Sequence, residues 1–275
     1  MAEAAPLVDV PYGDDSSAMV DVHLPEHAAG VLGLIVNLHG GGWYTGDKSL
    51  ATGCCAQLAA RGFVVVNANY RIPARNAIPA MVADALAVLR WVASQDAPEA
   101  VREASRLGIA LAGDSAGAHI AALTTCVELD EALARGLDVD ATAPAIDALV
   151  CWSGALSLEA LLVDAGHPLA ERFAVYLRAL TGGERVVERL AELDPLRWMS
   201  DRMPPTLVAT SALDFFRTSS LEYVRAARER GLPLELLDYD ASHSACTHSW
   251  QLDMLLRESQ ETYDLTAKVL STTFG

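Results

Sequence analysis

Short apolar runs alternate along the chain with longer segments in which apolar residues recur at helical spacing. The segment 33–38 (GLIVNL) has the apolar character of a strand that is covered on both faces of a sheet. The segment 78–94 instead places Met81, Ala85, Leu89 and Val92 on one stripe, which is typical of an amphipathic helix. The predicted strands are 8–10, 19–24, 33–38, 63–67, 109–112, 148–152, 206–210 and 234–239. The predicted helices are 47–61, 78–94, 116–129, 219–230 and 250–270. This alternation indicates an α/β layered sheet.

One segment, 154–200, interrupts the alternation after the sixth predicted strand. It is longer than an ordinary crossover and contains two helical patterns, 156–165 and 170–180. We interpret it as a small insertion in a single domain that spans 1–275. The apolar side chains expected to face the functional site from this insertion are Leu156, Leu161, Leu162, Phe173, Tyr176 and Leu177.

Composition narrows the class of protein. Of 275 residues, 52% are hydrophobic and 20% are charged, which provides a large core and excludes a disordered chain. The formal net charge of −16 argues against nucleic acid and membrane surfaces as partners. We read no secretory signal in residues 1–17 and no apolar run near the ~20 residues of a spanning helix. Five scattered cysteines indicate reduced thiols and a cytoplasmic protein.

The pentapeptide Gly113-Asp114-Ser115-Ala116-Gly117 matches the pattern G-x-S-x-G. The pattern is weak alone, but here a buried strand runs into it and an alanine-rich helix runs out of it. A serine on such a tight turn is exposed at the edge of the sheet, next to the N–H groups of the following helix. We therefore predict Ser115 as a nucleophile; an incidental serine in a glycine-rich turn is the alternative.

A second glycine-rich loop, His39-Gly40-Gly41-Gly42-Trp43, follows the strand 33–38. Consecutive glycines leave backbone N–H groups free to stabilise an oxyanion. A phosphate-binding loop is the poorer interpretation, because the lysine and Ser/Thr of such loops do not follow in register. His39 is expected to order the loop rather than to act in catalysis.

With these two motifs the chain resembles the α/β-hydrolase superfamily, and in particular the serine esterases that share an HGGG loop with hormone-sensitive lipase. The run Asn69-Tyr70-Arg71 and the helical segment after it are also similar to that group. The short stretch before the first strands is more similar to compact bacterial esterases grouped with feruloyl esterases and arylformamidases. The resemblance implies a mostly parallel eight-stranded sheet with helices on both faces and a cap insertion, 154–200, after strand six.

The resemblance also implies a catalytic triad in the chain order serine, acid, histidine. Asp214 follows the seventh predicted strand, and His243 follows the eighth. We therefore predict Ser115 as the nucleophile, His243 as its base and Asp214 as the acid that orients the imidazole. The alternatives are His248 as the base and Asp238 or Asp240 as the acid.

The remaining predictions concern the surroundings of the triad. The family's oxyanion donors correspond to the backbone amides of Gly41, Gly42 and Ala116. Trp43, Phe215 and Phe216 flank the expected cavity and are predicted to bind substrate, with ordinary core packing as the alternative. His119, on the helix after the nucleophile, is predicted to be a packing residue rather than a proton shuttle.

No metal or other cofactor is expected. His243, Cys246 and His248 lie close together in the sequence, but their spacing fits no standard zinc pattern and no fourth ligand is apparent.

These observations predict a serine hydrolase that cleaves small to medium carboxylic esters through an acyl-enzyme intermediate. An amidase of the arylformamidase type is the alternative on the same triad. A non-catalytic ligand-binding protein on a hydrolase scaffold is the alternative from a different class. The expected partner is a small-molecule ester, and the sequence leaves a homo-oligomer open.

Overall fold

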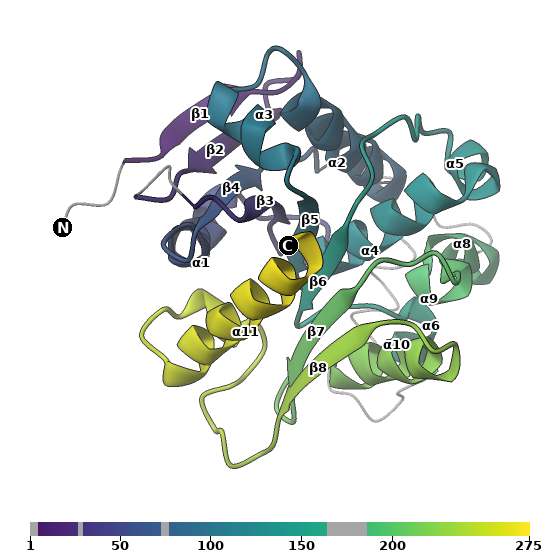
Figure 1. Cartoon of the computed structure of the whole chain (residues 1–275). Coiled ribbons are helices and arrows are strands. Elements are labelled where there is room, and N and C mark those ends of the chain that lie inside the picture. Colours follow the sequence, from purple (N-terminus) through teal and green to yellow (C-terminus); the bar gives the residue numbers. More distant parts are fainter. Residues whose placement is uncertain (1–4, 27–29, 73–76, 164–185) are drawn as a thin grey trace.

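Eight strands form one sheet in the computed structural model of the chain (Figure 1). The structure describes residues 5–26, 30–72, 77–163 and 186–275. The strands are β1 (Leu7–Pro11), β2 (Met19–His23), β3 (Gly33–Leu38), β4 (Phe63–Ala68), β5 (Ile109–Asp114), β6 (Ala148–Trp152), β7 (Thr206–Ser211) and β8 (Leu234–Tyr239). All eight strands predicted from the sequence are present, with ends that differ by a residue or two.

The strand order is β1-β2-β4-β3-β5-β6-β7-β8. β1 pairs antiparallel with β2, and β2 pairs antiparallel with β4, whereas every pair from β4 to β8 is parallel. The prediction of a mostly parallel eight-stranded sheet is therefore confirmed. Because the parallel strands end at the same edge, this edge collects the loops that follow β3, β5, β7 and β8.

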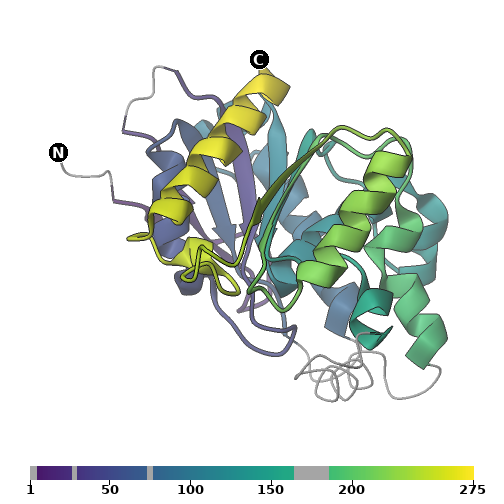
Figure 2. The same cartoon turned by 90° about the horizontal axis from the view of Figure 1, so that it is seen from below.

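Helices cover both faces of the sheet (Figure 2). The helical elements are η1 (Lys48–Ala51), α1 (Thr52–Ala59), α2 (Ala77–Ala93), α3 (Glu99–Ser105), α4 (Ala116–Leu129), α5 (Glu131–Leu137), α6 (Leu158–Val163), α8 (Val186–Leu193), α9 (Pro195–Trp198), α10 (Arg217–Glu229), η2 (Trp250–Leu252) and α11 (Arg257–Phe274). α1 and α11 lie on one face, and α2, α4 and α10 lie on the other.

The central strand β3 shows how the sequence divides the core between these two faces. Leu34 and Val36 belong to the apolar cluster under α2 and α4, whereas Ile35 belongs to the cluster under α1 and α11. This alternation follows from the two-residue period of a strand. Burial on both faces explains why the segment is apolar for most of its length.

Two helix predictions need correction. The predicted helix 47–61 divides into η1 and α1, and the predicted helix 250–270 divides into η2 and α11 with a turn between them. At the second division Asp253 and Leu256 are both extended, so the backbone cannot run as one helix. The short helices α3, α5, α8 and α9 were not predicted.

The insertion 154–200 is described only in part. Leu156 and Leu161 are buried in the larger core cluster, so the expectation that they face the site is not met for these two. The side chains of Leu162, Phe173, Tyr176 and Leu177, and the pattern at 170–180, lie outside the described residues.

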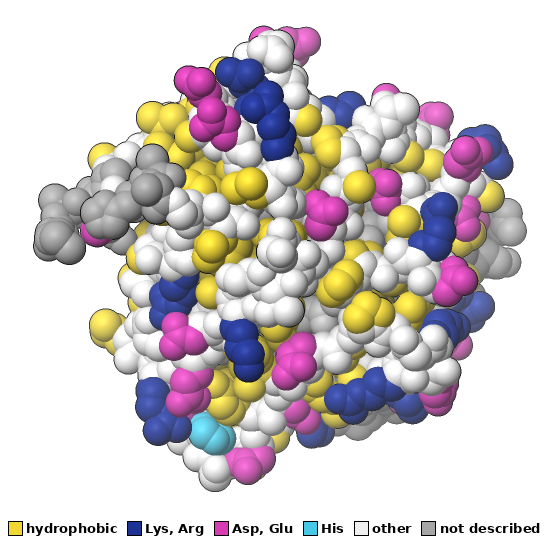
Figure 3. Space-filling view, in the orientation of Figure 1, with side chains coloured by type: hydrophobic (Ala, Val, Ile, Leu, Met, Phe, Trp, Pro, Cys, Tyr) yellow, Lys and Arg dark blue, Asp and Glu magenta, His cyan; other side chains and the backbone are white. Residues whose placement is uncertain are grey.

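Acidic and basic side chains intermingle over the face shown in Figure 3, with apolar side chains between them. The negative charge of the chain is thus spread over this face among cations. Within the described ranges, no helix combines the length and apolar character needed to cross a membrane.

Candidate active site

Ser115 lies at a sharp turn between β5 and α4, with φ 56° and ψ −117°. Its backbone N–H donates to the carbonyl of Trp152 on β6 at 2.9 Å, which fixes the turn to the sheet. A Cβ on Gly117 would collide with the carbonyl oxygens of Leu38 and His39, and one on Gly113 would collide with the backbone of Gly117. The two glycines of the motif are therefore required by close backbone approach, as expected for a nucleophile elbow.

A chain of hydrogen bonds connects Ser115 to His248 and Asp214. The Nε2 atom of His248 lies 2.8 Å from the Ser115 hydroxyl, and its Nδ1 atom lies 2.8 Å from a carboxylate oxygen of Asp214. The Asp214 side chain is fully buried, and that of His248 is 19% exposed. An imidazole that donates from Nδ1 to the carboxylate keeps Nε2 available to accept the hydroxyl proton.

Asp214 is held in place by its own loop. Its carboxylate accepts hydrogen bonds from the Phe216 backbone N–H at 2.9 Å and from the Thr210 hydroxyl at 3.2 Å. Both partners come from the end of β7 or from the turn that follows it. These contacts hold the carboxylate independently of the histidine. The sequence-based prediction pairs Asp214 with the imidazole of His243, whereas the structure places it beside that of His248. Asp238, one of the alternatives, instead forms an ion pair with Arg217 at 2.7 Å.

The prediction that His243 meets Ser115 is contradicted by the structure. The Nδ1 atom of His243 lies 2.9 Å from a carboxylate oxygen of Glu258, at the start of α11. After β8 the chain first turns at Asp240, whose carboxylate accepts the Ser242 N–H at 2.8 Å, and this turn directs His243 toward α11. The base position is occupied by the alternative, His248.

Contacts between the loop after β7 and the loop after β8 explain why His248 takes that position. The Ser211 hydroxyl donates to the backbone carbonyl of Cys246, and Leu213 forms an isolated parallel bridge with Thr247. Residues 246–248 therefore run beside residues 211–214, and the side chain of His248 reaches Asp214. The residue that carries this pairing is Ser211, the last residue of β7.

Asp114 holds the histidine loop from the other side. Its buried carboxylate accepts hydrogen bonds from the Ser249 hydroxyl at 2.9 Å and from the Gln251 amide. Burial raises the pKa of Asp114. The nearby His248 and the hydrogen bonds from Ser249 and Gln251 act to lower that pKa. The residue before the nucleophile thus ties the segment that carries His248 to β5. The sequence alone gave no indication of these two partners.

The HGGG loop lies across from the histidine. Gly41 and Gly42 have φ values of 132° and 64°, and a Cβ on Gly41 would collide with the Thr45 carbonyl. His39 stacks on Tyr70 with 4.3 Å between ring centroids, and its Nδ1 lies 2.7 Å from the Gly40 carbonyl. Burial lowers the pKa of His39, so a neutral ring that donates from Nδ1 fits this position. The expectation that His39 orders the loop agrees with these contacts.

A cavity of about 390 Å³ opens above the Ser115 hydroxyl. Its walls come from the HGGG loop, η1, the nucleophile turn, the acid loop and the histidine loop. The lining residues are His39, Gly40, Gly41, Gly42, Trp43, Tyr44, Leu50, Ala51, Asp114, Ser115, Phe215, Phe216, His248, Ser249 and Leu252. The cavity therefore contains two of the three predicted oxyanion residues and all three predicted aromatic residues. Ala116, the third predicted donor, is buried as the first residue of α4, where helical N–H groups have no partner within the helix.

The three aromatic residues differ in how they meet the cavity. Phe215 is partly exposed and lies against the His248 ring, with 3.8 Å between centroids. Phe216 and Trp43 are almost fully buried, with 6.4 Å between their ring centroids. All three line the cavity, Phe215 from a partly exposed position and Trp43 and Phe216 from almost fully buried ones.

Trp43 also takes part in a buried polar chain. Its indole N–H donates to Nδ1 of His119 at 3.1 Å, and Nε2 of His119 lies 2.9 Å from the Leu193 carbonyl. Because an indole only donates and a carbonyl only accepts, His119 is neutral with its proton on Nε2. Burial lowers the pKa of His119 to about 4. This chain connects the HGGG loop, α4 and the end of α8, and it supports a packing role for His119.

Comparison with known proteins relates this geometry to a family. The family model described as the alpha/beta hydrolase fold matches residues 35–249. A probable isoprenylcysteine alpha-carbonyl methylesterase of Arabidopsis thaliana is 29% identical over 208 residues. The match covers 74% of this chain but only 43% of the methylesterase. A kynurenine formamidase of Danio rerio is 29% identical over 236 residues, which cover 84% of this chain and 72% of the formamidase.

A solved structure shares the fold over nearly the whole chain. Esterase B of Lactobacillus rhamnosis, in an inhibited form, superposes with a TM-score of 0.85 at 20% identity. The superposition covers 98% of this chain and 87% of the esterase. At this identity the likeness establishes the fold.

Proposed function

We propose that this chain, which belongs to the α/β-hydrolase fold family, is a serine carboxylesterase that cleaves small to medium carboxylic esters. One observation carries the proposal: His248 lies 2.8 Å from both the Ser115 hydroxyl and the Asp214 carboxylate. A serine hydroxyl is a weak nucleophile at neutral pH until a base takes its proton. Ser115 and His248 line a cavity where an ester can reach them, and Asp214 lies buried behind the histidine.

The proposed reaction has two steps. Ser115 Oγ attacks the ester carbonyl carbon while its proton passes to Nε2 of His248, and His248 then donates that proton to the departing alcohol. In the second step His248 takes a proton from water, the resulting hydroxide attacks the acyl-enzyme, and the carboxylic acid leaves as Ser115 regains its proton. Asp214 keeps the imidazole in the required tautomer and stabilises the imidazolium that forms in both steps.

The negative oxygen of each tetrahedral intermediate needs hydrogen-bond donors. We propose the backbone amides of Gly41, Gly42 and Ala116 for this role. Gly41 and Gly42 line the cavity, and Ala116 begins α4 directly after the nucleophile. Loss of one such donor typically costs about 3 kcal/mol of transition-state stabilisation.

The lining of the cavity supports a neutral and largely apolar ester as substrate. Among the described lining residues there is no lysine or arginine that could pair with a substrate carboxylate. Phe215, Leu50 and Leu252 offer apolar surface instead. A net charge of −16 further disfavours anionic substrates and nucleic acid.

Two further proposals concern the surroundings of the site. We propose that the insertion 154–200 is part of the same single domain and serves as its cap. We also propose that the protein works in a reducing compartment such as the cytoplasm, because all five cysteines are buried free thiols.

An activated amide is the second candidate substrate, because a kynurenine formamidase is among the relatives. The same triad can cleave an amide. Parallel assays with p-nitrophenyl butyrate and N-formylkynurenine separate the two candidates. The ester is expected to have the larger kcat/KM, since N-formylkynurenine carries a carboxylate.

A fluorophosphonate probe tests the proposed chemistry directly. The wild-type chain is expected to be labelled at Ser115, and S115A is expected to remain unlabelled. A non-catalytic binding protein without an activated serine would not react. Efficient labelling of S115A, or none of the wild type, would refute the proposal.

A further inference from the structure

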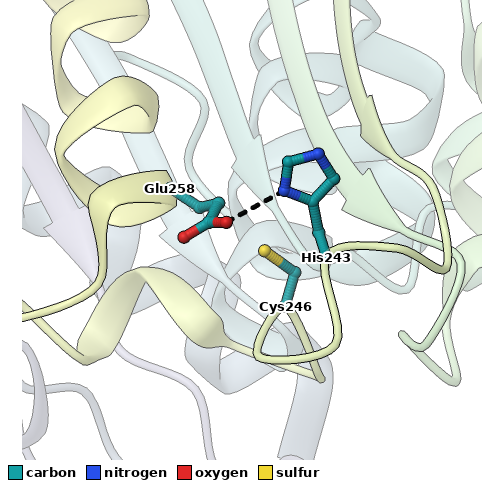
Figure 4. Close-up of side chains that lie close together, drawn as sticks. All are labelled: His243, Cys246 and Glu258. Carbon is teal, nitrogen blue, oxygen red and sulfur yellow. Dashed lines mark hydrogen bonds and ion pairs between the residues drawn. The ribbon is translucent and has the colours of Figure 1, made fainter.

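The loop between β8 and η2 carries three chemically reactive side chains, of which the proposed mechanism uses only His248. The other two, His243 and Cys246, point toward Glu258 in the first turn of α11 (Figure 4). The ligand atoms of His243, Cys246 and Glu258 all lie within 4.8 Å of one another. Nitrogen, sulfur and carboxylate oxygen thus converge on one point between a loop and a helix.

The backbone presents two of these donors in a chelating arrangement. His243 and Cys246 are three residues apart in a turn, in which the Cys246 N–H donates to the His243 carbonyl at 2.9 Å. The third donor, Glu258, is already 2.9 Å from Nδ1 of His243. The sequence pattern groups His243 and Cys246 with His248 and offers no further ligand, because Glu258 lies twelve residues beyond Cys246, on another element.

The spacing is close to that of a tetrahedral zinc site. Zinc bonds of about 2.0–2.3 Å place neighbouring donors about 3.4–3.8 Å apart. The longest distance between two of the three ligand atoms therefore has to shorten by about 1 Å. The distance between Nδ1 of His243 and the Glu258 carboxylate oxygen has to lengthen by about half that. The side chains of His243 and Glu258 are 28% and 18% exposed, so rotation of these two can supply the movement.

The donor set favours an ion of the zinc class over calcium or magnesium. Calcium and magnesium prefer oxygen ligands, whereas thiolate together with imidazole and carboxylate suits zinc or cobalt. Cys246 is completely buried beneath the other two ligands. The partly exposed side leaves room for water as a fourth ligand.

We propose that His243, Cys246 and Glu258 form a binding site for one divalent ion of the zinc class. Binding releases the Cys246 thiol proton to solvent and leaves a thiolate on the ion. Because Glu258 belongs to α11 and Cys246 is two residues before His248, the bound ion fixes the histidine loop to the C-terminal helix. The site is separate from the Ser115–His248 pair, so it can exist whether or not the proposed esterase activity does.

Metal titration of the full chain, first freed of metal with a chelator, tests this site. Cobalt is expected to bind in a 1:1 ratio and to give the charge-transfer absorption of a thiolate–cobalt bond. Zinc is expected to displace the cobalt and to raise the thermal midpoint of unfolding. C246S should lose the charge-transfer band, and E258Q should bind at least about 100-fold more weakly.

Asp264→Asn provides a matched control, since Asp264 lies on the same helix and pairs with Arg61 away from the cluster. This variant should bind cobalt as the wild type does. E258Q keeps the test decisive if C246S fails to fold, because Glu258 is partly exposed. Stoichiometric binding that E258Q leaves unchanged would overturn the proposal. The absence of a thiolate–cobalt band in the wild type would overturn it equally.

Discussion

The buried histidine His119 makes a prediction about the pH dependence of stability. Its ring accepts from the Trp43 indole and donates to the Leu193 carbonyl, and it has no exposed surface. Protonation of Nδ1 would convert the acceptor into a second donor facing an indole N–H. Burial lowers the pKa of His119 to about 4 in the folded protein, compared with about 6.5 for an unfolded histidine, and the hydrogen bond to the Leu193 carbonyl acts in the opposite direction.

The sign and size of the effect follow from linkage. Between about pH 4 and pH 6.5 the unfolded chain binds a proton at His119 that the folded chain does not bind, so stability rises with pH in this window. A difference of about 2.5 pH units corresponds to about 3 kcal/mol. This contribution is fully present above about pH 6.5 and is lost as the pH falls to about 4.

Replacement of His119 by glutamine isolates the effect, because glutamine offers an acceptor and a donor but does not titrate. Free energies of unfolding in urea should be measured for both proteins from pH 4.5 to pH 7.5. The difference between wild type and H119Q should change in favour of the wild type by roughly 2–3 kcal/mol as the pH rises. The contributions of other titratable groups, including buried His39, are the same in both proteins and cancel in the difference between their free energies of unfolding. A difference that is constant across this range would refute the assignment of a buried neutral ring.

Three further predictions concern the site. S115A should lower ester turnover roughly 10⁴-fold or more with little change in melting temperature, as measured by p-nitrophenyl ester hydrolysis and calorimetry. H248N should match S115A in the same assay, whereas H243N should retain activity within about tenfold; equal losses would argue against His248 as the base. W43F should destabilise the fold by about 1–3 kcal/mol in urea unfolding, because the buried Nδ1 of His119 loses its donor, and unchanged stability would contradict that hydrogen bond.

The parts of this molecule that the sequence predicts well are those determined by local patterns. The strand 33–38 is recognisable because both faces are buried, and burial on both faces requires an apolar run. The nucleophile turn is recognisable because both glycines of the pentapeptide are required by close backbone approach, Gly113 to Gly117 itself and Gly117 to the carbonyls at the end of β3. Asp214 is recognisable because the acid stands directly after a strand whose end is fixed by the sheet.

The position of the base could not be predicted in the same way, because the loop after β8 is not extended. His243 is the first histidine after the strand, but the Asp240 turn directs it to Glu258. What brings His248 to Ser115 is pairing with segments distant in the sequence. These contacts depend on tertiary structure, and neither hydrophobic periodicity nor distance from the strand encodes them.

The polar residues that fix this loop share a position in the sheet. Ser211 at the end of β7, Ser153 after β6 and Asp114 at the end of β5 each hydrogen-bond the segment 246–251. Each is a polar residue at, or directly after, the carboxyl end of a buried strand, where a side chain without a partner would be costly to bury. Their partners must therefore come from the loop that crosses this edge. Ser249 is the partner of both Ser153 and Asp114, and His248 stands directly before it, so these contacts place His248 rather than His243 beside Ser115.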